Sequence, residues 1–225
     1  MRLAALLLLF LLPGLSVRAE VFVLALSWQP QFCETAGRRK PECAVQRGQY
    51  FAQNLVLHGL WPQAGDYCGI PEEQRRDDKA RRWENLPALD PQLVDSLKDV
   101  MPGSRSYLER HEWVKHGSCS GLDAANYYRN AADLVRQVNR LNLRQLIAEH
   151  AGGKISYADL CRTLIADFGA TASHAISLKL TKSGDLEEIR IRLARTDRLE
   201  LAPGRRDSLK CADQRDRVIG IDAAN

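Results

Sequence analysis

The segment HEWVKHGSC, residues 111–119, holds two histidines, a glutamate and a lysine within six consecutive positions. Such a segment is a metal-binding helix, an acid–base catalytic site, or a charged helix surface beside a structural cysteine. A zinc-protease helix carries HExxH, because histidines four positions apart share one helix face. His111 and His116 are five positions apart, so on a regular helix they diverge by roughly 140°, and Lys115 would repel a bound cation. The spacing therefore disfavours a metal site.

The same segment places groups of useful chemistry on one helix surface. His111 lies one turn from Lys115, and Glu112 lies one turn from His116, on neighbouring stripes of the predicted helix. Together these side chains can hold a phosphate and exchange protons. An isolated helix with this pattern is more often an ordinary charged surface, so a second segment has to decide between the two interpretations.

The apolar run LVLHGLWP, residues 55–62, contains a candidate partner. His58 lies within a predicted buried strand and precedes Gly59, which permits close approach of the backbone. Taken alone, His58 is equally well explained as a core residue, and Trp61 as either a core residue or a surface on which a base stacks. Two histidines from separate elements form an acid–base pair if the fold brings them together.

HGLWP and HEWVKHGSC, in this order and at this separation, resemble the two active-site segments of the ribonuclease T2 family. FVLALSWQPQFC (22–33) is similar to the first strand and first cysteine of that family. MPG (101–103) followed by LERHEWVKHGSCSG (108–121) resembles its bacterial periplasmic members in particular. The similarity is clear over residues 21–140 and looser beyond them.

The resemblance implies roles for five residues. The family cleaves RNA without a metal or other cofactor, by attack of a ribose 2′-OH on the adjacent phosphate to give a 2′,3′-cyclic phosphate. His58 and His116 match the acid–base pair, and imidazole suits both roles because it titrates near neutral pH. Glu112 and Lys115 match residues that stabilise the charged phosphorus centre. His111 matches an auxiliary phosphate-binding histidine.

Two aromatic residues are candidates for contacts with bases. Trp61 matches a residue near a base-binding site of the family, and Tyr67 is a further candidate for stacking, which tolerates any base. Gln63 stands where some fungal relatives carry a base-recognising aspartate, so base preference does not transfer. We therefore expect a monomeric endoribonuclease that cleaves single-stranded RNA with low base specificity. The alternative is a non-catalytic RNA-binding relative, which would not require the four residues matched to catalysis.

The rest of the chain predicts an α+β fold. Apolar runs at 21–30 and 54–62 predict strands, alternation over 173–181 and 186–194 predicts a β-hairpin, and 217–221 is a possible last strand. Helical patterns lie between them, with Asp90 and Ser104 as the N-caps of the first two; they cover residues 90–103, 104–117, 122–139, 143–153 and 156–169. Helices clustered between strands indicate a mostly antiparallel central sheet with packed helices.

The N-terminus predicts export. Arg2, an apolar run over residues 3–12, and the small residues Val17 and Ala19 are typical of a signal peptide over residues 1–19. The run is too short to span a bilayer, although a retained anchor is the alternative. Loss of this peptide would lower the formal net charge of +4 by two units. The remaining charge is only mildly basic and does not indicate a global electrostatic attraction to nucleic acid. We expect residues 20–225 to form one catalytic domain, periplasmic or secreted, without a membrane segment.

All six cysteines follow the predicted peptide. An even number in an exported chain predicts three disulfides, although six cysteines allow fifteen pairings. The family resemblance implies Cys68–Cys119 and Cys161–Cys211, which leaves Cys33 to pair with Cys43. A Cys68–Cys119 bridge would tie the loop after HGLWP to the end of the helix that carries His116.

Overall fold

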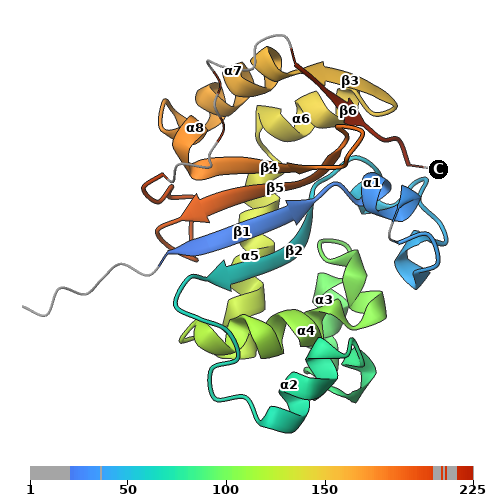
Figure 1. Cartoon of the computed structure of the whole chain (residues 1–225), viewed down its shortest axis with the longest axis vertical. Coiled ribbons are helices and arrows are strands. Elements are labelled where there is room, and N and C mark those ends of the chain that lie inside the picture. The colour runs from blue at the N-terminus through green and yellow to red at the C-terminus, as the bar shows by residue number, and fades with distance from the viewer. Residues whose placement is uncertain (1–20, 36, 205–208, 210, 212–216, 225) are drawn as a thin grey trace, which may run out of the picture.

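A computed structural model describes residues 21–35, 37–204, 209, 211 and 217–224, so the predicted signal peptide lies outside the described residues. Its central element is a four-stranded sheet with the order β2-β1-β5-β4, in which every neighbouring pair is antiparallel (Figure 1). The strands are β1 (Phe22–Ser27), β2 (Val56–Pro62), β4 (Ile176–Leu180) and β5 (Leu186–Leu193). A second sheet pairs β3 (Gly153–Ser156) with β6 (Val218–Ile221).

One helix lies between β1 and β2, and seven more lie between β2 and β4 in the part of the chain that the structure describes. They are α1 (Gln29–Glu34), α2 (Glu72–Lys79), α3 (Pro91–Leu97), α4 (Leu108–Lys115), α5 (Ala124–Val138), α6 (Asn142–Glu149), α7 (Tyr157–Phe168) and α8 (Ala172–Ala175), with short 3-10 turns between some of them. The predicted α+β class, with a mostly antiparallel sheet and packed helices, is confirmed.

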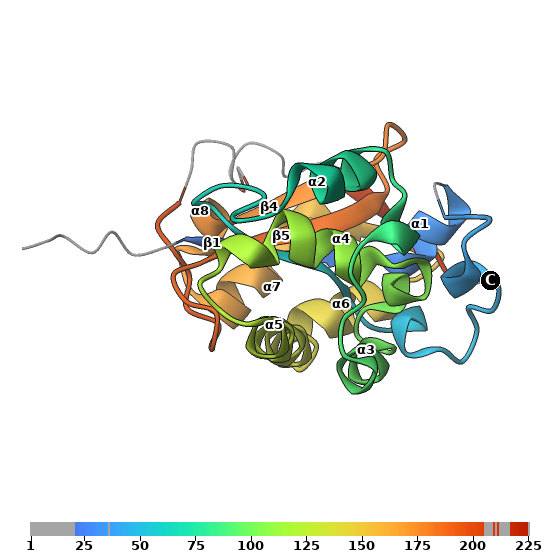
Figure 2. The ribbon, with the colours of Figure 1, turned by 90° about the horizontal axis from the view of Figure 1, so that it is seen from below.

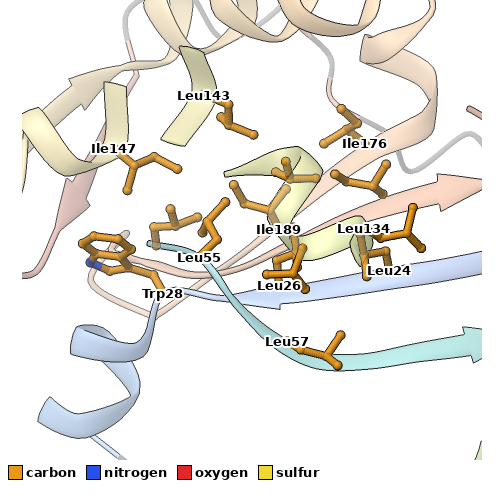
Figure 3. Packing of buried hydrophobic residues seen from close by; sticks show 14 of the residues in the cluster. Leu24, Leu26, Trp28, Leu55, Leu57, Leu134, Leu143, Ile147, Ile176 and Ile189 are labelled. Atoms are coloured by element: carbon orange, nitrogen blue, oxygen red, sulfur yellow. The ribbon is translucent and has the colours of Figure 1, made fainter. Parts of the chain in front are cut away.

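One face of the sheet builds the core. Leu24 and Leu26 of β1 lie opposite Ile191 and Ile189 of β5, and all four are fully buried. Figure 2 shows α5 end-on beside the sheet, and Figure 3 shows Leu134 of that helix among the strand side chains. Side chains alternate across a strand, so residues 188 and 190 of β5 belong to the opposite face.

Strand β2 contains an irregularity at His58. Leu57 pairs with Leu26 of β1 and Gly59 pairs with Ala25, which leaves His58 as the extra residue between two consecutive pairs. A β-bulge of this kind bends a strand and redirects a side chain. His58 is therefore a sheet residue whose direction is set by a local break in the ladder.

Several predicted boundaries were wrong. Asp90 caps α3 through bonds from the N–H groups of Gln92 and Leu93, but that helix ends at Leu97. Ser104 is not an N-cap, because Pro102–Ser106 form a 3-10 turn and α4 starts after Tyr107, which has a φ of 64°. A 3-10 turn thus replaces the first turn of the predicted helix 104–117, and it ends at a residue with a left-handed backbone conformation.

Glycines explain a strand that the sequence pattern missed. The predicted helix 143–153 ends at Glu149, and Gly152 adopts a φ of 83° before β3 begins at Gly153. A left-handed glycine is a common end to a helix. The predicted strand 173–181 likewise starts later, at Ile176, because α8 occupies the preceding residues.

The three implied disulfides, Cys33–Cys43, Cys68–Cys119 and Cys161–Cys211, are all formed in the structure. Across the part of the chain that the structure describes, no helix has the length and apolar character needed to cross a membrane.

Candidate active site

The site lies where β2 and the C-terminal end of α4 meet. α4 supplies His111, Glu112 and Lys115, and His116 follows at its C-cap. The chain leaves the α-helix at that point, because a 3-10 turn starts at Gly117. His116 therefore departs from the regular helical direction, and its ring centroid lies 6.3 Å from that of His111.

Glu112 is the centre of the cluster and is 1% exposed. Its Oε1 lies 3.6 Å from Nε2 of His58 and 3.8 Å from Nε2 of His111. Its Oε2 accepts a hydrogen bond of 2.8 Å from the indole N–H of Trp61. A buried carboxylate is stable only when such partners surround it, so this side chain ties β2 to α4.

Trp61 is in ring contact with both His58 and His116. Its ring centroid is 5.3 Å from that of His58 and 5.4 Å from that of His116. The structure thus brings His58 and His116, which are separated by almost sixty positions in the sequence, into contact with the same aromatic ring.

His111 is held by residues of the polar segment between β2 and α3. Its Nδ1 lies 2.6 Å from Oδ1 of Asp78, and its ring stacks on Trp83 at 4.7 Å. The hydroxyl of Tyr67 donates to Oδ2 of the same aspartate at 2.7 Å. The position of this histidine is therefore fixed from α2 and the turn that follows it.

Tyr67 and Lys115 are close through the backbone: the N–H of Tyr67 donates to the carbonyl of Lys115 at 2.8 Å. The ring of Tyr67 is flanked by Arg75 and Lys79, whose charged groups lie 5.9 and 5.8 Å from its centroid. Tyr67 is thus part of the wall of the site, next to α2, and its hydroxyl is engaged with Asp78.

The two histidines differ in proton affinity. Burial, together with the positive charges of Lys115, His111 and His58, lowers the pKa of His116 to about 3. For His58, burial alone would lower the pKa, but the hydrogen bond to Glu188 and the charges of Glu112 and Glu188 outweigh it and raise the pKa above its ordinary value. The site therefore favours the neutral form of His116 and the protonated form of His58.

The carboxylates shift in opposite directions. Burial raises the pKa of Glu112, against the pull of His58, His111 and the Trp61 hydrogen bond. Asp78 is also buried, which would raise its pKa, but the hydrogen bonds from His111 and Tyr67 lower it. Among the described residues, no three histidine, cysteine, aspartate or glutamate side chains are grouped so that they could hold a metal ion.

A protein-family model, described as the Ribonuclease T2 family, matches residues 19–213. The chain belongs to the ribonuclease T2 family. Its activity is that of an endoribonuclease of this family, as the two motifs predicted.

Ribonuclease I of Escherichia coli is 31% identical over 233 residues, which cover 84% of each chain. A ribonuclease of Aeromonas hydrophila is 34% identical over 115 residues, 51% of this chain and 44% of that protein. The predicted similarity to bacterial members is confirmed.

Solved T2 structures share the fold at low sequence identity. A self-incompatibility-associated ribonuclease of Nicotiana alata gives a TM-score of 0.59 at 16% identity, covering 90% of this chain and 98% of the other. A ribonuclease-related protein from Calystegia sepium gives 0.57 at 14% identity, covering 92% and 98%. At this identity the similarity concerns the T2 fold only.

The sequence patterns did not indicate five residues of the site: Asp66, Asp78, Trp83, Glu188 and Arg190. Oδ1 of Asp66 lies 3.0 Å from Nδ1 of His116. Glu188 lies 2.5 Å from Nδ1 of His58, and Arg190 places its guanidinium 5.2 Å from the Trp61 ring centroid. The alternation of LEEIRIRL did contain a signal for the last two, because it separates Glu188 and Arg190 from the isoleucines of the core face.

Proposed function

We propose that this T2 ribonuclease cleaves single-stranded RNA by metal-independent transphosphorylation, with His58 and His116 as the acid–base pair. The observation that supports the proposal is that two histidines with opposite pKa shifts both contact the ring of Trp61. General acid–base catalysis needs one partner with a proton and one without it.

The proton affinities assign the roles. Neutral His116 accepts the proton of the 2′-OH, the oxygen attacks the adjacent phosphorus, and the P–O5′ bond breaks. Protonated His58 donates to the departing 5′-oxygen, which leaves a 2′,3′-cyclic phosphate. The reaction requires a 2′-OH, so DNA is not a substrate.

The neighbouring groups stabilise the negative charge that develops on the phosphorane or position the histidines. Lys115 is the ammonium next to His116, and preorganised positive charge stabilises such a centre. His111, fixed by Asp78 and Trp83, is the auxiliary phosphate ligand. Glu112 orients His58 and Trp61 from its buried position.

The proposal includes low base specificity, because the side chains matched to base contacts are aromatic. Trp61 and Tyr67 provide aromatic surfaces, and stacking on an aromatic ring does not depend strongly on base identity. The further parts of the proposal are removal of residues 1–19 as a signal peptide, a periplasmic or secreted location, and a monomeric enzyme with one catalytic domain over residues 20–225.

The products of RNA cleavage in excess EDTA test the reaction. We expect fragments that end in 2′,3′-cyclic phosphate, at a rate that chelation does not change. Cleavage that stops on chelation would contradict the metal-independent mechanism. No cleavage at all would favour the alternative, a non-catalytic RNA-binding relative.

The histidine pair is tested by H58A and H116A. Each change should lower kcat/KM by at least about a hundredfold, the usual contribution of a positioned acid or base. Circular dichroism should show that both variants keep the fold. Near-normal rates in both folded variants would refute the acid–base assignment.

A further inference from the structure

Glu188 of β5 is buried in the sheet, with an exposed fraction of 3%. Both of its carboxylate oxygens have partners. Oε2 lies 2.5 Å from Nδ1 of His58, and Oε1 accepts from Nε of Arg190 at 2.5 Å. Burial alone would raise the pKa of this carboxyl, but the bonds to His58 and Arg190 lower it. Glu188 is therefore a charged group directly behind one of the two proton-transfer residues.

The strand register explains how His58 reaches β5 across the intervening strand. In β1, Ser27 lies opposite Glu188, and Ala25 lies opposite both Arg190 and Gly59. These β1 residues have small side chains, which leaves room above the middle strand. The bulge at His58 places its imidazole between those two levels. The contact is thus built into the sheet and does not depend on a loop.

We propose that Glu188 is a positioning residue for His58, which it holds with Nδ1–H directed toward β5 and Nε2 directed toward the reacting phosphate. The proposal deepens the function proposed above and rests on it. Nε2 lies 3.6 Å from Glu112 on the side of α4, so the two carboxylates face opposite edges of the ring, and Glu188 is the one within hydrogen-bond distance. Arg190 in turn fixes Glu188 through the second oxygen.

The charges around His58 give this contact a measurable consequence. Glu188 and Arg190 face it from β5, and Glu112 and His116 face it from the end of α4. Burial and Arg190 lower the pKa of His58, whereas Glu188 and Glu112 raise it. If Glu188 loses its charge, Glu112 is the only one of these two carboxylates left to stabilise the imidazolium. The pKa of His58 must therefore fall.

A purely structural role for Glu188 makes a different prediction. If the residue served only to pair with Arg190 inside the sheet, its replacement would change stability and leave the titration of His58 unchanged. The neighbouring Glu187 provides a matched control. It lies on the same strand, is partly buried, and pairs with Lys179 at 3.3 Å, away from His58.

The experiment compares E188Q with E187Q in the full protein. Glutamine keeps an acceptor for Nδ1–H and removes the charge. NMR titration, with the His58 resonances identified by their loss in H58Q, should show the pKa of His58 in E188Q lower by about one unit or more. The alkaline limb of the kcat/KM profile should move to lower pH by the same amount, with little change in KM. E187Q should match the wild type in both measurements.

A His58 titration in folded E188Q that matches the wild type would overturn the proposal. If E188Q does not fold, E188D serves instead: the carboxylate is retained but withdrawn by one methylene, so the pKa of His58 should fall only in part, and an unchanged pKa would again overturn it. Because the NMR titration needs no turnover, it remains separate from the test of function. A wild-type protein that forms no cyclic phosphate would refute the proposed function whatever His58 does.

Discussion

Gly59 is the residue on which the contact between Glu112 and Trp61 depends. A Cβ at this position would lie 2.0 Å from Oε2 of Glu112 and 2.3 Å from Nε1 of Trp61. Both are polar atoms of the site, and they bond to each other at 2.8 Å. The absence of a side chain at position 59 therefore lets α4 approach β2 closely enough for one carboxylate to serve both elements.

We expect G59A to lower kcat/KM by at least about tenfold, because displacements of an ångström in a catalytic site have effects of that size or more. Steady-state cleavage of RNA, with thermal unfolding measured in parallel, tests this. G153A is the control, since its nearest neighbour is a backbone carbonyl of His150 at 3.3 Å, outside the site. Equal activities in G59A and the wild type would show that the Glu112–Trp61 contact is not needed.

Individual residues differ in how far sequence predicted them. His58, Glu112, Lys115 and His116 were predicted because they stand within two short motifs. Glu188 was not predicted, since its contact with His58 depends on the strand order β2-β1-β5 and on a bulge. Neither feature can be read from a local pattern. Asp78 was missed for a similar reason: it lies in a charged helix of no evident function and becomes meaningful only beside His111.

At the scale of elements, two disulfides of nearly equal span have different neighbours. Cys68–Cys119 and Cys161–Cys211 have sequence separations of 51 and 50. The first joins the loop after β2 to the 3-10 turn that follows His116. The second joins α7 to the C-terminal region. In the chain-entropy view, each bridge contributes about 4 kcal/mol through the unfolded state, so the two should matter equally for stability.

Their effects on activity should differ. We expect C68S/C119S to lower kcat/KM by about tenfold or more at temperatures where the variant stays folded, because the loop carrying Asp66 and Tyr67 loses its anchor beside His116. C161S/C211S should lose a similar free energy of unfolding and retain near-normal kcat/KM. Chemical denaturation and RNA cleavage, measured on both variants, check this. Equal activity losses would indicate that the first bridge has no special part in aligning the site.

Element types were easier to predict than their ends. The strands at both ends of the chain and the helices between them followed from periodicity, because each buries one apolar face. The ends depended on local backbone geometry, such as the left-handed Tyr107 before α4 and Gly152 before β3. Strand β3 has four residues and only one buried side chain, so its sequence shows almost no alternation of apolar and polar residues. It is a strand because its backbone pairs with β6.

Across the whole molecule, the burial of a neutral His116 links activity to acid stability. In the unfolded chain this histidine has its ordinary pKa near 6.5, whereas in the folded protein its pKa is about 3. Between these values the unfolded state binds the proton and the folded state does not. The contribution of His116 to the free energy of unfolding therefore decreases as the pH falls from about 6.5 toward 3. His58, with a raised pKa, acts in the opposite sense: its contribution is present at low pH and is lost as the pH rises through its folded-state pKa.

H116Q isolates the contribution of His116, because the other titrating groups are common to both proteins. Between pH 8 and pH 5 the wild type should lose about 2 kcal/mol of unfolding free energy through this group, which corresponds to about 4–8 °C in Tm for a chain of this size. The pH-dependent decrease in Tm should be smaller in H116Q by that amount, while its RNA cleavage is lost. Calorimetric scans of both proteins at the two pH values provide the measurement. The same decrease in both would mean that His116 is not held neutral by the fold, and its assignment as the base that accepts the 2′-OH proton would then lose its physical basis.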